Sequence, residues 1–204
     1  MRKILFSLSV ILVAALAVKF GMAANVAAPS TGVTVGKAAP QFKLLDQNGV
    51  DVSLATYAGK VIVLEWVNPE CPFVQFQYQH HTMVNLAAKY KDKGVVWISI
   101  NSARDDTNAI NKTWATEQAV TYPVLNDASG GTGHAYGATN TPGMVVIGKD
   151  GMLLYRGAID SDPNEDGKPT TINYVDQALS EVLAAKPVSV PETKQYGCSV
   201  KYAE

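Results

Sequence analysis

The chain has 204 residues, 47% of them hydrophobic, and its 17 basic and 18 acidic residues leave a formal net charge of −1. No run of Lys and Arg forms a basic patch, so we expect no nucleic-acid partner. Only 2 cysteines are present, too few for a disulfide-dense scaffold, so the fold must rest on a hydrophobic core.

Residues 1–23 have the layout of a secretory signal peptide. Arg2 and Lys3 precede the apolar run 4–18, and small residues surround a cleavage point after Ala23. This run is shorter than a membrane span, so we expect no stable membrane insertion after cleavage. An uncleaved anchor is the alternative. We expect an exported protein, in the periplasm of a Gram-negative bacterium or secreted.

The elements after the signal peptide predict one domain. Residues 24–38 are small and without period, which is typical of a linker. We place the folded domain at 39–186 and a C-terminal tail at 187–204. The tail carries Cys198 and is expected to be irregular, and mobile in the reduced protein if its cysteine takes part in turnover.

Within the domain, strand and helix patterns alternate. A hairpin is predicted at 41–54, around Asp46-Gln47-Asn48-Gly49. The further elements expected are strands at 61–67, 95–100, 122–125, 144–147 and 152–156, helices at 72–90, 105–118 and 172–185, and a glycine-rich loop at 129–133. This order predicts an α/β fold with a central mixed sheet, helices on both faces and an N-terminal β-hairpin.

Cys71 stands where the strand 61–67 hands over to the helix that starts at Pro72. Proline suits the first helical position, because its missing N–H would be unpaired there anyway. A sulfur at this point faces the positive end of the helix dipole, which stabilises the nucleophilic thiolate. Most free cysteines are only small buried hydrophobes. Its position at the helix start favours a reactive role.

Several motifs in order resemble the alkyl hydroperoxide reductase/thiol-specific antioxidant (AhpC/TSA) group of the thioredoxin-like superfamily. They are Ala39-Pro40-x-Phe42-x-Leu44-x-Asp46-x-x-Gly49, then Tyr57-x-Gly59-Lys60-Val61, then Cys71-Pro72-Phe73-Val74 and the closing Tyr196-Gly197-Cys198-Ser199-Val200-Lys201-Tyr202. The last two look like peroxiredoxin-like bacterial redoxins. The resemblance covers nearly all of the mature chain and implies a thioredoxin-like fold.

The resemblance also implies roles for particular residues. Thr141-Pro142 corresponds to the cis-proline turn that packs opposite the cysteine. We expect Pro72, Thr141, Pro142 and Trp66 to line the substrate site. Glu65 lies six residues before the cysteine, where thioredoxins carry a buried carboxylate that relays protons. Its alternative is a structural carboxyl bonded to a Lys or Tyr, such as Lys60, because burying an unpaired acid is costly.

Two departures weaken parts of this resemblance. Val74 stands where thioredoxins have a second cysteine, so no local dithiol can form. Peroxiredoxins carry Thr or Ser where Asn68 stands, together with a pocket arginine. Asn68 can still donate a hydrogen bond, but Arg104 and Arg156 are the only arginines of the mature chain.

Cys198 is the only possible internal partner of Cys71, and three states remain open. It can resolve a sulfenic acid on Cys71, form a static disulfide that pins the tail, or stay unpaired. The leading function is a thiol-dependent, peroxiredoxin-like peroxidase. The alternatives are a thiol–disulfide oxidoreductase acting on exported proteins and a redox-silent binding domain.

The partners expected are a peroxide or a protein disulfide, together with an external thiol reductant that is thioredoxin-like or a membrane reductase. We expect no cofactor and no metal site, because His80 and His81 are adjacent on a helix and point in different directions.

Overall fold

The computed structural model describes residues 33–168 and 171–203. The predicted signal peptide and residues 24–32 of the predicted linker lie outside the described residues. Residues 33–38 pack on the domain: the Gly36 N–H donates to the Leu153 carbonyl (2.8 Å), and Ala38 forms a β-bridge with Met152. The packed domain therefore includes residues that we assigned to the linker.

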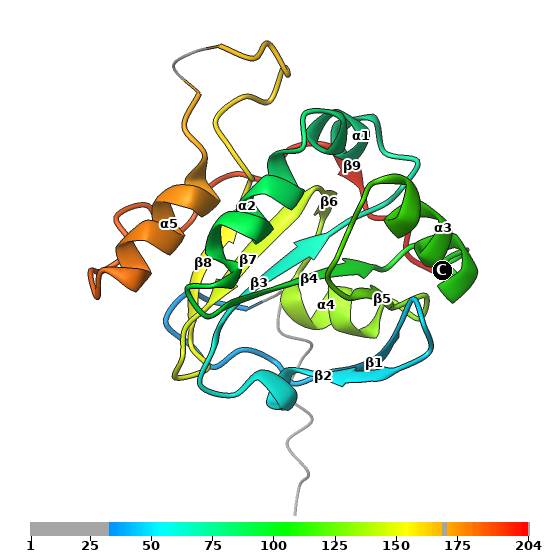
Figure 1. Ribbon diagram of the computed structural model, residues 1–204, viewed down its shortest axis with the longest axis horizontal. Coiled ribbons are helices and arrows are strands. Elements are labelled where there is room, and N and C mark those ends of the chain that lie inside the picture. Colours follow the sequence, from blue (N-terminus) through cyan, green and yellow to red (C-terminus); the bar gives the residue numbers. More distant parts are fainter. Residues whose placement is uncertain (1–32, 169–170, 204) are drawn as a thin grey trace, which may run out of the picture.

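A seven-stranded mixed sheet forms the centre of the domain (Figure 1), in the order β2-β1-β5-β4-β3-β7-β8. The strands are β1 (Lys43–Asp46), β2 (Asp51–Ser53), β3 (Val61–Trp66), β4 (Val95–Asn101), β5 (Val124–Asn126), β7 (Gly143–Ile147) and β8 (Leu153–Gly157). β3, β4 and β5 are parallel, and the remaining pairs are antiparallel. β3 is buried along its whole length, as its unbroken run of mostly apolar residues predicts.

Helices cover both faces of this sheet. They are η1 (Leu54–Tyr57, a 3-10 turn), α1 (Pro72–Gln79), α2 (Thr82–Lys91), α3 (Asn108–Glu117), α4 (Gly131–Tyr136) and α5 (Tyr174–Leu183). α1, α2, α3 and α5 contribute to one hydrophobic core, which contains Cys71. α4 and η1 contribute to the other. The predicted α/β class with a central mixed sheet and an N-terminal hairpin is confirmed.

The single helix predicted at 72–90 is divided into α1 and α2. His81 adopts a left-handed conformation (φ 55°), which non-glycine residues seldom adopt and histidine tolerates better than most. Nδ1 of His80 lies 2.8 Å from the Phe76 carbonyl oxygen. These two adjacent histidines therefore end one helix and start the next.

The glycine-rich segment predicted as a loop at 129–133 contains the start of α4. Asp127 accepts hydrogen bonds from the N–H groups of Thr132 (3.1 Å) and Gly133 (2.8 Å). Free N–H groups in the first turn of a helix need such acceptors. Asp127, which precedes the glycines in the sequence, was the signal that could have predicted this helix. Its hydrogen bonds outweigh the weak helix propensity of glycine.

The C-terminal tail is not irregular throughout. It contributes β9 (Cys198–Ser199), which pairs antiparallel with β6 (Asn140–Thr141) in a separate small sheet. Figure 1 shows β9 in red beside β6, near α1. Tyr202 stacks on His134, with 3.9 Å between ring centroids. Its hydroxyl donates to the Ala138 carbonyl (2.7 Å). The expectation of an irregular tail is therefore corrected for its end, which forms a strand and packs against the domain.

Among the described residues, no helix has the length and apolar character needed to span a membrane.

Candidate active site

Cys71 caps the N-terminus of α1, at the end of a turn that leaves the buried strand β3. Its backbone is extended (φ −79°, ψ 119°), and Pro72 occupies the first turn of the helix. The Cys71 N–H donates to the Asn68 carbonyl (3.0 Å), and the Asn68 side-chain oxygen accepts the Glu70 N–H (2.8 Å). The turn therefore presents the sulfur to the free N–H groups of the helix.

Thr141 lies directly against this sulfur. Its peptide bond to Pro142 is cis, as the family resemblance implies. The Cys71 thiol donates to the Thr141 carbonyl oxygen at 3.1 Å. The buried Thr141 hydroxyl finds no hydrogen-bond partner among the described residues. It is near enough to donate to Cys71 once the thiol loses its proton, which helps to lower the pKa of Cys71.

Cys198 is brought to the same place by β9, where it pairs with Thr141 across the small sheet. Both cysteines are free thiols. Cys71 is buried, with 2% of its surface exposed, whereas Cys198 is only partly buried. Two residues that are 127 positions apart in the chain therefore lie side by side at the start of α1.

The two thiols differ in acidity. Burial alone would raise the pKa of Cys71, but hydrogen bonds from the Cys198 thiol, the Thr141 side chain and the backbone lower it below its usual value. Burial and the neighbouring Cys71 raise the pKa of Cys198 to about 11. The arrangement therefore favours a thiolate on Cys71 with Cys198 as its proton-bearing donor.

Glu65 is completely buried on β3. Its carboxyl accepts hydrogen bonds from Trp97 Nε1 (2.8 Å), the Ser99 hydroxyl (3.2 Å) and the Tyr78 hydroxyl (3.1 Å). Burial raises the pKa of Glu65 to about 7, although these bonds work in the opposite direction. The sequence suggested a Lys or a Tyr as partner. Lys60 is not among the hydrogen-bond partners of Glu65, whereas Tyr78 is.

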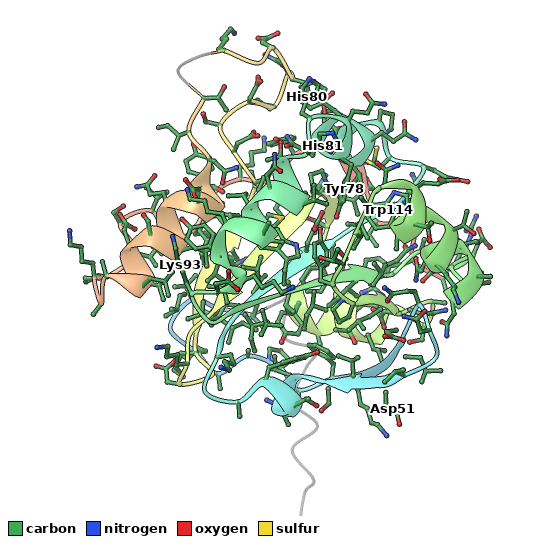
Figure 2. All side chains as sticks on the ribbon, viewed as in Figure 1. Asp51, Tyr78, His80, His81, Lys93 and Trp114 are labelled. Carbon is green, nitrogen blue, oxygen red and sulfur yellow. The ribbon has the colours of Figure 1, made fainter. Side chains whose placement is uncertain are left out.

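The hydroxyl of Tyr78 continues this network, since it lies 3.0 Å from the hydroxyl of Tyr122. Burial and the nearby Glu65 raise the pKa of both tyrosines far above its ordinary value, so both stay protonated. Figure 2 shows Tyr78 close to Trp114, and their rings meet edge to face at 4.7 Å. Glu65 therefore sits at the end of a polar chain within the core that contains Cys71.

Sequence reasoning missed most of this network. Ser99 pairs directly with Glu65 in the register of β3 and β4, and Trp97 lies two residues earlier on the same face. Strand alternation could have found both residues, once the two strands were aligned. Tyr78 lies on the buried face of α1, which the helical period of the predicted helix could have shown.

Trp66 is not brought to the sulfur, which corrects its expected place in the substrate site. Successive side chains of a strand point to opposite faces, so Trp66 points away from the face of Glu65. It packs on Tyr136 in the other core, with ring centroids 5.3 Å apart, and its indole N–H donates to Ser102 (3.2 Å).

A groove of about 550 Å³ lies between α1 and α3, close to this turn. It is lined by Pro69, Gln75, Gln79, Ala109, Ile110, Thr113, Trp114, Glu117 and Gln118. Neither cysteine lines it. This groove therefore gives no direct path to Cys71.

The sheet order, the strand-to-helix cysteine and the cis-proline opposite it define a thioredoxin-like redox fold. The model of the Redoxin family matches residues 34–175, and the chain belongs to that family. It is similar to the thiol-disulfide oxidoreductase ResA of Bacillus cereus, with 27% identity over 153 residues, which covers 75% of this chain and 86% of the relative.

Two solved structures share most of the fold. An uncharacterized conserved protein from Geobacillus kaustophilus is 32% identical, has a TM-score of 0.74, and the match covers 83% of this chain and 93% of that one. A hypothetical protein from Sinorhizobium meliloti 1021 is 26% identical, has a TM-score of 0.77, and the match covers 84% and 96%. The relatives together support a thioredoxin-like redox role and a thiol-dependent oxidoreductase.

Proposed function

We propose that this protein is a thiol–disulfide oxidoreductase in which Cys71 is the nucleophile and Cys198 the second redox cysteine. The observation that carries the proposal is the position of Cys198, which pairs with Thr141 while the Thr141 carbonyl accepts the Cys71 thiol. The lowered pKa of Cys71 and the raised pKa of Cys198 support it. Thiolate is the attacking species in disulfide exchange. The similarity to thiol-disulfide oxidoreductases supports the same chemistry.

The reaction has two exchange steps. The Cys71 thiolate attacks one sulfur of a substrate disulfide, so a mixed disulfide forms and the other substrate sulfur leaves as a thiolate and takes up a proton. Cys198 then gives up its proton and attacks the sulfur of Cys71. The Cys71–Cys198 disulfide forms and the second substrate thiolate leaves, so the substrate is reduced by two electrons and the protein is oxidised by two.

An external thiol reductant closes the cycle. The thiol of lower pKa is the better leaving group, so the reductant should attack the sulfur of Cys198 and expel Cys71 as thiolate. Cys198 is also the more exposed of the two cysteines. A second attack by the reductant on its own mixed disulfide restores both thiols. In this scheme Thr141 donates to the thiolate of Cys71, and Pro72 and Pro142 shape its surroundings.

Glu65 has a proposed role as a proton store. A carboxyl with a pKa of about 7 exchanges its proton near neutral pH, which is the range in which the thiols must gain and lose theirs. The proposed route for this proton is the chain of hydrogen bonds from Glu65 through the hydroxyls of Tyr78 and Tyr122. The other possibility, a carboxyl that only ties strands and helix together, predicts the same contacts, so activity must decide between them.

The peroxidase function has less support. Asn68 uses its side-chain oxygen to accept the Glu70 N–H within the turn, and among the described residues its amide donates no hydrogen bond to Cys71. Arg104 pairs with Asp105, and Arg156 with Glu192. Neither arginine is thus engaged with the cysteines. Disulfide exchange needs no peroxide-orienting pocket.

The proposed setting is outside the cytoplasm, and its support is the pattern of residues 1–23. Substrates there would be disulfides of exported proteins, and the reductant a thioredoxin-like or membrane protein.

A direct comparison of oxidants tests the proposal. Reduced protein is mixed with either a small disulfide, such as hydroxyethyl disulfide, or hydrogen peroxide, and oxidation is followed by mass spectrometry. We expect the disulfide to generate the Cys71–Cys198 bridge much faster than it reacts with free cysteine, whereas Cys198→Ser stops at a mixed disulfide on Cys71. Faster reaction with peroxide than with the disulfide would favour the peroxidase function instead.

A further inference from the structure

A small cavity of about 130 Å³ lies beside the turn that leads into Cys71. Residues of that turn, of the end of β4 and of the loop after it line the cavity, and they include Asn68, Glu70, Asn101, Asp105, Asp106 and Lys201. Neither cysteine is among the lining residues. The cavity therefore has no part in the proposed thiol exchange, although it lies next to it.

Asp106 is the buried charged residue of this cavity, with 7% of its surface exposed. Its Oδ2 accepts the side-chain amide of Asn111 (2.8 Å), whereas its Oδ1 has no hydrogen-bond partner among the described residues. Leaving a buried carboxylate oxygen without a donor costs free energy, so such oxygens are normally bonded. Asp106 can therefore accept one more donor, from a bound group.

A chain of buried amides holds this carboxylate in place. Asn111 Oδ1 accepts the side-chain amide of Asn101 (3.1 Å), and Asn101 Oδ1 accepts the Ala103 N–H (3.2 Å). Both asparagines are almost completely buried. The acceptor is therefore oriented before anything binds, and a ligand does not have to order it.

The charges around the cavity favour a cation. Glu70 and Asp106 form no ion pair within the described part of the chain, and Asp105 pairs only with the exposed Arg104 (3.4 Å). Lys201 is the single basic residue of the lining, against these three acidic ones. Burial raises the pKa of Asp106 to about 7, and a bound cation would stabilise its ionised form.

An organic cation suits the cavity better than a metal ion. In the described ranges, no group of three His, Cys, Asp or Glu side chains is arranged to hold a metal. A guanidinium group carries five N–H donors in a planar fork that matches carboxylates. One N–H can therefore meet Oδ1 of Asp106 while the others face the remaining acceptors of the cavity.

The wider groove between α1 and α3 continues from this cavity, because both are lined by Pro69 and Ile110. Ile110 is 44% exposed, and Trp114 forms a buried aromatic wall of the groove. Gln75 adds an exposed amide at the rim. Apolar surface and amides of this kind contact the residues on either side of an arginine, which a free guanidinium compound does not have.

We propose that the cavity binds the guanidinium group of an arginine side chain of a partner protein, and that the apolar neighbours of that arginine lie in the groove between α1 and α3. This docking surface goes beyond the thiol exchange and does not depend on it. It holds the partner beside Cys71 through charge and apolar contact, without using either sulfur.

Peptide titrations followed by amide NMR shifts of the isotope-labelled, reduced protein test the proposal. The probes are Ac-Leu-Arg-Leu-NH2 and Ac-Gly-Arg-Gly-NH2, each with a matched version in which uncharged citrulline replaces arginine. The proteins are wild type, Asp106→Asn, Lys201→Gln, Ile110→Ser and the control Asp92→Asn, which changes an exposed carboxyl at the end of α2. Asp106→Asn keeps the shape of the side chain but replaces the unpaired acceptor by a donor.

We expect the leucine-flanked arginine peptide to bind wild type about fivefold or more tightly than its citrulline version, with the largest shifts at residues 68–70 and 103–106. Asp106→Asn should remove this preference, and Lys201→Gln should tighten binding roughly twofold because it removes a like charge. Ile110→Ser should weaken binding of the leucine-flanked peptide and leave the glycine-flanked one unchanged. Asp92→Asn should bind as wild type does.

Equal binding of the arginine and citrulline peptides to wild type would overturn the proposal. An affinity that Asp106→Asn leaves unchanged would do the same, and if that variant does not fold, an unchanged affinity in Lys201→Gln decides against it. Arginine-dependent binding that ignores both the flanking leucines and Ile110→Ser would refute docking of a protein segment. No thiol takes part in these titrations, so failed peptide binding leaves the oxidoreductase function standing, and failed disulfide exchange leaves the arginine site standing.

Discussion

Replacing Glu65 by glutamine removes a completely buried carboxyl with a raised pKa and changes how stability depends on pH. Burial raises the pKa of Glu65 from 4.5 to about 7 in the folded protein. Between these two values the unfolded chain has lost this proton and the folded protein still holds it. Raising the pH through this window therefore favours the unfolded state.

The size of the effect follows from the same two values. At about 1.4 kcal/mol for each pH unit, the difference between 4.5 and about 7 amounts to roughly 3 kcal/mol. Glu65 is completely buried, so solvent does not screen this energy. The wild-type free energy of unfolding should fall by this amount, from this group alone, between pH 4.5 and pH 8. In Glu65→Gln this contribution is absent.

Urea unfolding of both proteins at half-unit steps from pH 4.5 to 8, with a phosphine reductant, measures the difference. Asp106 also has a pKa raised to about 7, by burial first of all, but it is present in both proteins and cancels. Glu70→Gln changes an exposed carboxyl and serves as the matched control. From pH 4.5 to pH 8, the free energy of unfolding of Glu65→Gln should rise by roughly 3 kcal/mol relative to that of wild type. If the unfolding free energies of the two proteins changed in parallel with pH, the reasoning would be refuted.

The remaining predictions concern the two cysteines and the opposite face of the sheet. Cys198→Ala removes a donor to Cys71, so the pH midpoint of iodoacetamide alkylation of Cys71 should rise by about one unit, while Cys198→Ser should keep most of the wild-type midpoint because a hydroxyl also donates. An unchanged midpoint in Cys198→Ala would show that this thiol does not stabilise the thiolate. Trp66→Phe should lower the urea-unfolding free energy by roughly 1–3 kcal/mol yet leave the rate of disulfide exchange within about twofold, because Trp66 packs away from the sulfur. A large loss of exchange would place it back in the site.

Local signals in the sequence predict the position of Cys71 well. The buried run 61–67, the break after it and Pro72 each specify the same junction, and the structure starts a helix there. The Thr141–Pro142 turn is likewise confirmed as cis. The strand-to-helix junction depends on residues that are near one another in the chain, which is why pattern reasoning reaches it, whereas the cis bond was implied by the family resemblance.

The face of the sheet on which each β3 side chain lies could not be predicted. Both faces of β3 are buried, so its sequence shows no polar alternation to mark them. Glu65 and Trp66 are adjacent and equally buried, yet they lie in different cores. Only their contacts distinguish the two residues. Glu65 bonds to β4 on the side of the sheet that contains Cys71, whereas Trp66 packs on α4 on the opposite side.

The position of Cys198 could not be predicted for a different reason. A two-residue strand has no period, and its pairing with β6 joins segments far apart in the chain. What holds it lies outside the strand, in the aromatic contacts of Tyr196 and Tyr202. Both tyrosines belong to the closing motif that resembles the bacterial redoxins, but the motif does not tell which residues they pack on.

The pairing of β6 with β9 brings a second cysteine close to Cys71, although Val74 stands where thioredoxins have theirs. A local dithiol needs a second cysteine on the same helical turn, and this chain has a buried valine there. The second sulfur instead arrives on a strand, opposite the threonine that already holds the first. The two sulfurs that the proposed exchange requires are therefore brought together by strand pairing and not by one helical turn.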